Sequence, residues 1–184
     1  MRFLSVFTLV AVMISSCNTN PFQEEIAELD SMSNVLDSLE HSVASLNPDT
    51  LAKWNAYANS RASVIKRKLR DTAFANKHLD VISEVIADAK YLEKMSKARS
   101  ELSQELEYTQ TQLEKLMVAL KSNAIDSTKA FEYMASERMA VLNLENDVNK
   151  RVPLAKNAIE TLSSLSVELD SLMNYMDQNG YFTP

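Results

Sequence analysis

Apolar residues recur along most of this chain at alternating spacings of three and four, which is the pattern of a helix that buries one stripe. The pattern is strongest in the middle of the chain, where the alternation continues without a slip and seven of nine positions are apolar. These nine positions are Leu92, Met95, Arg99, Leu102, Leu106, Thr109, Leu113, Leu116 and Leu120. The segment is therefore predicted to be a long helix with a coiled-coil seam.

Three other segments show the same periodicity and are predicted to be helices over about 22–46, 48–70 and 126–178, while the seam helix covers about 73–122. The inward positions expected in them are Leu29, Met32, Leu36, Leu39, Val43 and Leu46; Leu51, Trp54, Ala58 and Ile65; and Phe131, Met134, Val141, Val148, Val152, Ile159, Leu162, Leu169, Met173 and Met176. Each stripe needs a covering partner, so the helices are expected to lie lengthwise against one another.

Residues that start and stop helices stand at the expected boundaries. Asn47 can cap the helix that Pro48 begins. Asp126 or Ser127 can cap the last helix, and Gly180 follows its end, where a left-handed residue is common. The predicted fold is all-α, an elongated antiparallel helical bundle or coiled-coil hairpin.

The chain contains one glycine in 184 residues, against an average usage of about 7%. Strand-rich domains and phosphate-binding loops need glycine, whereas long helices do not. Neither glycine nor proline enforces a break near residue 71, so one continuous helix over 48–122 is an open alternative. Pro153 lies inside the last predicted helix, where a kink is expected.

The connection between the helices at 73–122 and 126–178 is only a few residues long, so the two must run antiparallel. Folding this hairpin about residue 124 places Arg99 about one turn from Glu145. An unpaired charge in a buried seam is costly. We therefore predict that Arg99 and Glu145 pair and fix the register of the hairpin.

The first sixteen residues have the organisation of a secretory signal peptide. Arg2 supplies a positive charge, residues 3–14 are mostly apolar, and Ser15 and Ser16 are small residues suited to cleavage. The apolar run is too short for a membrane-spanning helix, which takes about 20 residues. A cleaved signal peptide over 1–16 is therefore predicted.

The segment Ile14-Ser15-Ser16-Cys17 resembles the lipobox of bacterial lipoproteins. The resemblance implies a diacylglycerol thioether on Cys17, cleavage before it, and acylation of the new N-terminus, palmitate being a typical acyl group. Residues 17–21 would then be the lipidated cysteine and a short tether to a single helical domain at 22–179, with a tail at 180–184. Asn18 rather than aspartate follows the cysteine, which favours the outer membrane over the inner one.

The two shorter helices, 22–46 and 48–70, are expected to pack beside the membrane-proximal half of the hairpin. Otherwise a second protomer must cover the exposed stripe. Residues 1–16 carry one positive charge and no negative charge, so their removal changes the net charge from −6 to −7. Such an acidic chain lacks the basic footprint of a nucleic-acid-binding protein. The lipid is therefore expected to supply the membrane attachment.

Candidate chemistry is sparse. His41 and His78 are the only histidines, and neither forms a zinc-type pair or a Glu-x-x-His motif. The acidic group of Glu24, Glu25 and Glu28 could hold a cation, but the favoured interpretation is a solvated, dipole-stabilised helix start. The basic cluster at 66–70 is interpreted as a solvated helix end. No metal, cofactor or catalytic residue is predicted.

The sequence therefore favours a non-catalytic envelope lipoprotein, whose helical rod holds distance, self-associates or binds an envelope protein. The alternative is a ligand-binding or sensory bundle, with a small molecule near Trp54, Tyr57 or Pro153. An enzyme is the least favoured of the three classes.

Overall fold

The computed structural model describes residues 20–68 and 77–180. The helices there are α1 (Gln23–Ala44), α2 (Pro48–Lys68), α4 (Leu79–Lys121) and α5 (Ser127–Gln178). No strand occurs in these ranges, so the predicted all-α fold is confirmed. The predicted signal peptide and Cys17, together with residues 69–76 and the predicted tail at 181–184, lie outside the described residues.

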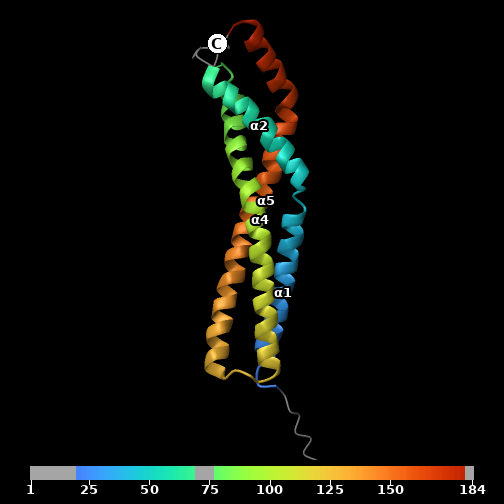
Figure 1. The fold of residues 1–184 in the computed structure, drawn as a ribbon, viewed down its shortest axis with the longest axis vertical. Coiled ribbons are helices and arrows are strands. Elements are labelled where there is room, and N and C mark those ends of the chain that lie inside the picture. The colour runs from blue at the N-terminus through green and yellow to red at the C-terminus, as the bar shows by residue number, and fades with distance from the viewer. Residues whose placement is uncertain (1–19, 69–76, 181–184) are drawn as a thin grey trace, which may run out of the picture.

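The four helices form an elongated bundle (Figure 1). α4 and α5 make the predicted antiparallel hairpin, α1 lies along the half that contains the α4–α5 turn, and α2 lies along the other half. α2 packs against α4, which excludes a single continuous helix over 48–122. Within the described residues, α1 and α2 make no contact with each other.

The expectation that both short helices pack beside one half of the hairpin is wrong. α1 has 22 residues and α2 has 21, which together match the 43 residues of α4. The apolar stripe of α4 is continuous from Ile82 to Leu120 and needs a cover at every level. Placing α1 and α2 one after the other supplies that cover, so that three helices surround the core in each half.

The core follows the stripes read from the sequence. All six predicted inward residues of α1 and its exit, from Leu29 to Leu46, are buried, and so are eight of the nine seam positions of α4. Arg99, the ninth, is half-buried. Removing a large side chain from such a core costs about 2–5 kcal/mol, so this apolar burial is the main source of stability.

Phe131 is the one predicted core residue that lies on the surface, with 70% of its area exposed. The neighbouring Ala130 is buried instead, at 2% exposure, and Met134 follows it one turn later. A straight helix drifts by about 20° per heptad relative to a seven-residue repeat. The heptad positions assigned from the middle of α5 are therefore wrong in the first turn of this helix, where the small Ala130 faces inward instead of Phe131.

The helix boundaries have the predicted caps. Asn47 Oδ1 accepts hydrogen bonds from the backbone N–H groups of Asp49 and Thr50, at 2.9 and 3.0 Å. Asp126 caps α5 by accepting from the Lys129 N–H at 2.9 Å. Gly180 has φ +72°, the left-handed conformation expected after a helix end. α5 continues through Pro153 without ending.

Candidate functional site

The described chain begins at Asn20, at the end of the bundle where α4 turns into α5 (Figure 1). Asn20 Nδ2 donates hydrogen bonds to the carbonyl groups of Leu120 and Lys121, at 3.0 and 3.2 Å. Its Oδ1 accepts from the Phe22 N–H at 2.8 Å. One side chain thus satisfies unpaired backbone groups at the start of α1 and the end of α4. It also holds Asn20 at this end of the bundle.

Cys17 precedes Asn20 by three positions. Three residues of extended chain span at most about 10 Å. Cys17 itself, the predicted lipid attachment site, lies outside the described residues.

Arg99 does not make the predicted pair with Glu145. Its Nε donates a hydrogen bond to the carbonyl oxygen of Leu46 at 3.0 Å, where α1 has ended and α2 has not begun. Among residues 20–68 and 77–180, no ion pair within 4.0 Å joins Arg99 to Glu145. The predicted pair follows from the α4–α5 hairpin alone, whereas the seam of α4 also faces the junction between α1 and α2. At that junction the carbonyl oxygen of Leu46 accepts the hydrogen bond from the Arg99 guanidinium.

Glu28 has a partner that the sequence analysis missed. Arg138 on α5 binds both of its carboxylate oxygens, with Nη2 to Oε2 at 2.6 Å. The hydrogen bond from Arg138 holds the pKa of Glu28 below its usual range. The acidic start of α1 is therefore not merely solvated, because Glu28 links α1 to α5 in a bidentate pair.

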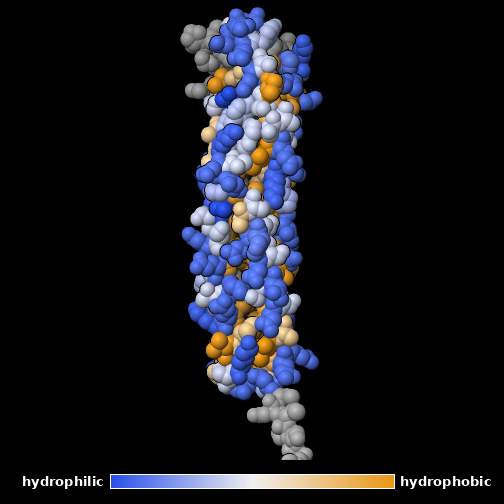
Figure 2. Space-filling model, turned by 90° about the vertical axis from the view of Figure 1, so that its right-hand side faces the viewer, coloured by the Kyte–Doolittle hydropathy of each residue, from blue (hydrophilic) through white to orange (hydrophobic). Residues whose placement is uncertain are grey.

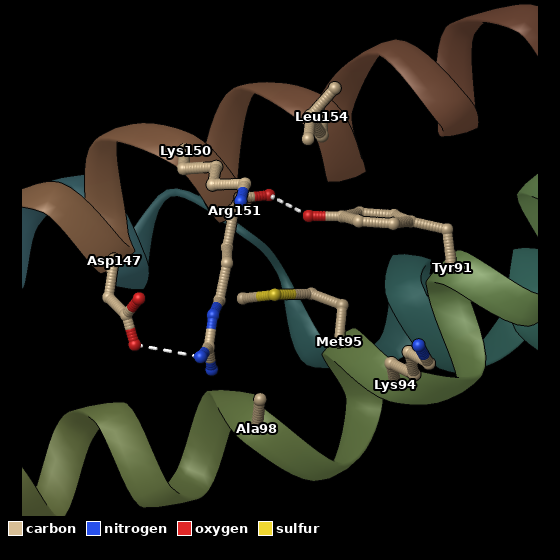
Figure 3. Close-up of a pocket in the computed structure, with 8 residues that line it drawn as sticks. All are labelled: Tyr91, Lys94, Met95, Ala98, Asp147, Lys150, Arg151 and Leu154. Atoms are coloured by element: carbon tan, nitrogen blue, oxygen red, sulfur yellow. Dashed lines mark hydrogen bonds and ion pairs between the residues drawn. The ribbon is translucent and has the colours of Figure 1, made fainter.

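A hollow of about 360 Å³ lies between α4 and α5 beside Pro153, one of the places expected to hold a ligand. Figure 3 shows Tyr91 reaching from α4 to α5, where its hydroxyl donates to the carbonyl oxygen of Arg151 at 2.9 Å. The Arg151 side chain runs back toward Asp147 and forms an ion pair at 2.7 Å. The Tyr91 bond joins the two helices two residues before the proline.

The hollow has a cationic rim and an apolar floor. Its lining comprises Tyr91, Lys94, Met95, Ala98, Asp147, Lys150, Arg151 and Leu154. Arg151 pairs with Asp147, the one carboxylate of the lining, and Lys94 and Lys150 are its other cations, so an anionic group with an apolar portion fits this chemistry best. Burial raises the pKa of Tyr91, whose hydroxyl donates to the Arg151 carbonyl oxygen.

A second polar cluster joins α2 to α5. The Tyr57 hydroxyl donates to Asp170 Oδ1 at 2.9 Å and contacts the Ser166 carbonyl oxygen at 3.1 Å. Arg61 pairs with the same carboxylate at 3.0 Å and lies 4.3 Å from the centre of the Tyr57 ring. Trp54 packs edge-on against that ring at 5.4 Å. The tyrosine and arginine are four residues apart, the spacing of one helical face.

The other candidate residues stay apart. His41 Nδ1 lies 2.7 Å from the Asp37 carbonyl oxygen, and His78 immediately precedes α4. Within the described ranges, no three histidine, cysteine or acidic side chains come close enough together to hold a metal ion. In the basic cluster, Lys66 is exposed, and residues 69 and 70 lie outside the described structure.

Compared with known proteins, the chain matches no family model, no curated protein and no solved structure. In the described part of the chain, no helix has both the length and the hydrophobicity that crossing a bilayer requires.

Proposed function

We propose that this protein is a lipid-anchored, non-catalytic envelope protein, attached by acylated Cys17, whose helical rod holds distance from the membrane and binds a partner. The position of Asn20 carries the proposal. Its bonds to Leu120 and Lys121 hold Asn20, the first described residue, at one end of the long axis. An anchor three residues earlier therefore attaches the rod by an end and leaves its length available.

The dimensions of the bundle agree with such a role. α5 has 52 residues and is about 78 Å long, at 1.5 Å per residue. Its exposed apolar residues are spread along the helix and include Met139, Leu142 and Val167. A long surface with scattered apolar positions can contact an envelope protein or a second copy of the chain. In the proposed location, the outer membrane is favoured over the inner one.

Labelling with radioactive palmitate in Gram-negative cells tests the anchor, and co-purification from membranes identifies the partner. Label should appear in the wild-type protein and be absent from Cys17→Ala, while Ser16→Ala, which keeps a small residue before the cysteine, retains it. The labelled protein should fractionate with the outer membrane. An unlabelled wild-type protein in the soluble fraction would contradict the proposal.

The hollow beside Pro153 favours a second candidate function, the binding of an anionic amphiphile. Lys94 and Lys150 come from different helices, so a bound anion would bridge α4 and α5 across the apolar floor. Ligand binding stabilises the state that binds, which raises the melting temperature.

A thermal-shift series with alkyl phosphates tests this second function. Lys94→Gln and Lys150→Gln should reduce the shift, and Lys156→Gln, at an exposed position on α5 outside the hollow, should not. Equal shifts in all three variants would show that the phosphates act elsewhere.

A further inference from the structure

We propose that the end of the bundle at the α4–α5 turn is a membrane-contact surface, on which Phe131 and Val118 insert into the headgroup region of a neutral or anionic bilayer. The inference rests on the proposed acylation of Cys17 and deepens it. It assigns to this end a lipid contact of its own and fixes which end of the rod faces the membrane.

The two side chains flank the turn and lie near the tip of the bundle. Val118 precedes the last residue of α4 by three positions, and Phe131 follows the first residue of α5 by four. At 1.5 Å per residue, they lie about 4.5 and 6 Å from their helix ends. The headgroup region of one leaflet is about 5–8 Å thick. A tip that rests in this region brings both side chains into it.

Both side chains are highly exposed for apolar residues. Phe131 is 70% exposed and Val118 66%, while Ile125 in the turn between them is only half-buried. Figure 2 shows hydrophobic side chains gathered at the surface near the lower end of the bundle, which is the end of the α4–α5 turn in Figure 1. Aromatic and aliphatic residues on the apolar face of interfacial segments bury about 5–10 Å into this boundary.

The N-terminal segment decides what covers this surface. Asn20 is hydrogen-bonded to the last residues of α4, and Cys17 lies at most about 10 Å of chain away. With diacylglycerol on Cys17, the bilayer surface comes within reach of the tip. A bilayer is therefore the partner that the lipid on Cys17 would bring against this end of the bundle.

The charges around the tip show that apolar insertion carries the contact. Two cations, Lys121 and Lys129, stand against four acidic residues, Asp126, Glu132, Glu24 and Glu25. This net negative charge gives no attraction to anionic lipid. The contact should therefore form on neutral bilayers and should not require anionic lipid.

Site-directed spin labelling of the acylated protein in vesicles tests the inference. Because acylation occupies Cys17, the only native cysteine, Phe131→Cys and Val118→Cys each provide a single labelling site. Val167→Cys is the matched control, since Val167 is 77% exposed on the same helix about 54 Å farther along. Accessibility to oxygen, which partitions into lipid, is compared with accessibility to a water-soluble nickel complex. The vesicles are phosphatidylcholine, with or without phosphatidylglycerol.

The labels at 118 and 131 should have a higher ratio of oxygen to nickel accessibility than the label at 167, in both kinds of vesicle. Flotation of the vesicles and mass spectrometry of Cys17 test the lipid anchor separately from the membrane-contact surface. A protein that is not acylated or does not float overturns the anchor. If the protein is acylated and floats, three results would contradict the membrane-contact surface and leave the anchor intact. The three labels could be equally exposed to water, or the label at 167 could be as exposed to lipid as the other two. The contact could also require anionic lipid.

Discussion

Arg99 donates a hydrogen bond from Nε to the carbonyl oxygen of Leu46 at 3.0 Å, and so joins the middle of α4 to the junction between α1 and α2. The carbonyl follows the end of α1, where backbone acceptors lose their helical partners. The arginine is the one charged residue in the seam of α4. It marks the level at which the cover of α4 changes from α1 to α2.

Replacing Arg99 by methionine should lower the free energy of unfolding by about 1–3 kcal/mol, because Leu46 loses a charged donor. Glu145→Gln should have an effect of less than about 0.5 kcal/mol, because Glu145 is only half-buried and forms none of the ion pairs found in the described structure. Urea unfolding of both variants and of the double variant measures their coupling energy. Near-zero coupling agrees with the structure, whereas strong coupling would restore the seam pair between Arg99 and Glu145.

The first turns of α5 allow a matched test of which side faces the core. Met134→Ala should cost about 2–5 kcal/mol, because Met134 is 1% exposed and its removal leaves a cavity. Phe131→Ala removes a larger side chain but should change the stability by less than about 0.5 kcal/mol. Thermal or urea unfolding gives both values. The reverse order would mean that the original heptad frame was right.

Asp88 on α4 is expected to destabilise the fold at neutral pH. Burial raises the pKa of its carboxyl, Glu84 adds to the rise, and Oδ2 has no hydrogen-bond partner within the described structure. Asp88→Asn should therefore raise the stability at pH 7 by about 1 kcal/mol.

The gain from Asp88→Asn should shrink as the pH falls through the raised pKa of Asp88, because the wild-type carboxyl then becomes neutral in the folded protein. Chemical unfolding from pH 7 down to below the ordinary carboxyl value of 3.8 follows the trend. Glu105→Gln, at an exposed position on α4, is the control. A gain that is constant with pH would exclude ionisation as its cause.

The pair of Glu28 and Arg138 has the opposite pH dependence. The pKa of Glu28 is lowered in the folded protein, so its contribution is present above the unfolded value of 4.5 and is lost as the pH falls through the folded value. Glu28→Gln should lower the free energy of unfolding at pH 7. The variant should also lose less stability than the wild type as the pH falls. Glu24→Gln removes the same charge from an exposed position and should leave the acid dependence unchanged. Identical acid profiles for wild type and Glu28→Gln would contradict the role of the pair.

The helices and most of their buried faces were predictable because periodicity records which residues avoid water. The stripe from Leu29 to Leu46 and the seam of α4 needed no knowledge of the partner helix. The level at which each short helix packs was not predictable from its own stripe. The levels of α1 and α2 follow from comparing the lengths of α1, α2 and α4. The apolar seam of α4 is continuous, so other helices must pack against it along its whole length.

The polar contacts were less predictable than the core. A seam arginine signals that a partner exists, but both a carboxylate and a backbone carbonyl can accept its hydrogen bond. The pairing of Glu28 with Arg138 and of Tyr57 with Asp170 joins residues more than one hundred positions apart. Such pairs depend on the relative rotation of helices, which periodicity fixes only to within about one residue.

The chemical state of Cys17 decides whether this protein is a lipid-anchored one. Mass spectrometry of the N-terminal peptide from the membrane-extracted protein measures this directly. The prediction is a mature chain that begins at Cys17 and carries a diacylglycerol thioether, with residues 1–16 removed. A chain that retains Met1 and a free Cys17 thiol would contradict the lipid anchor and the membrane-contact surface that depends on it.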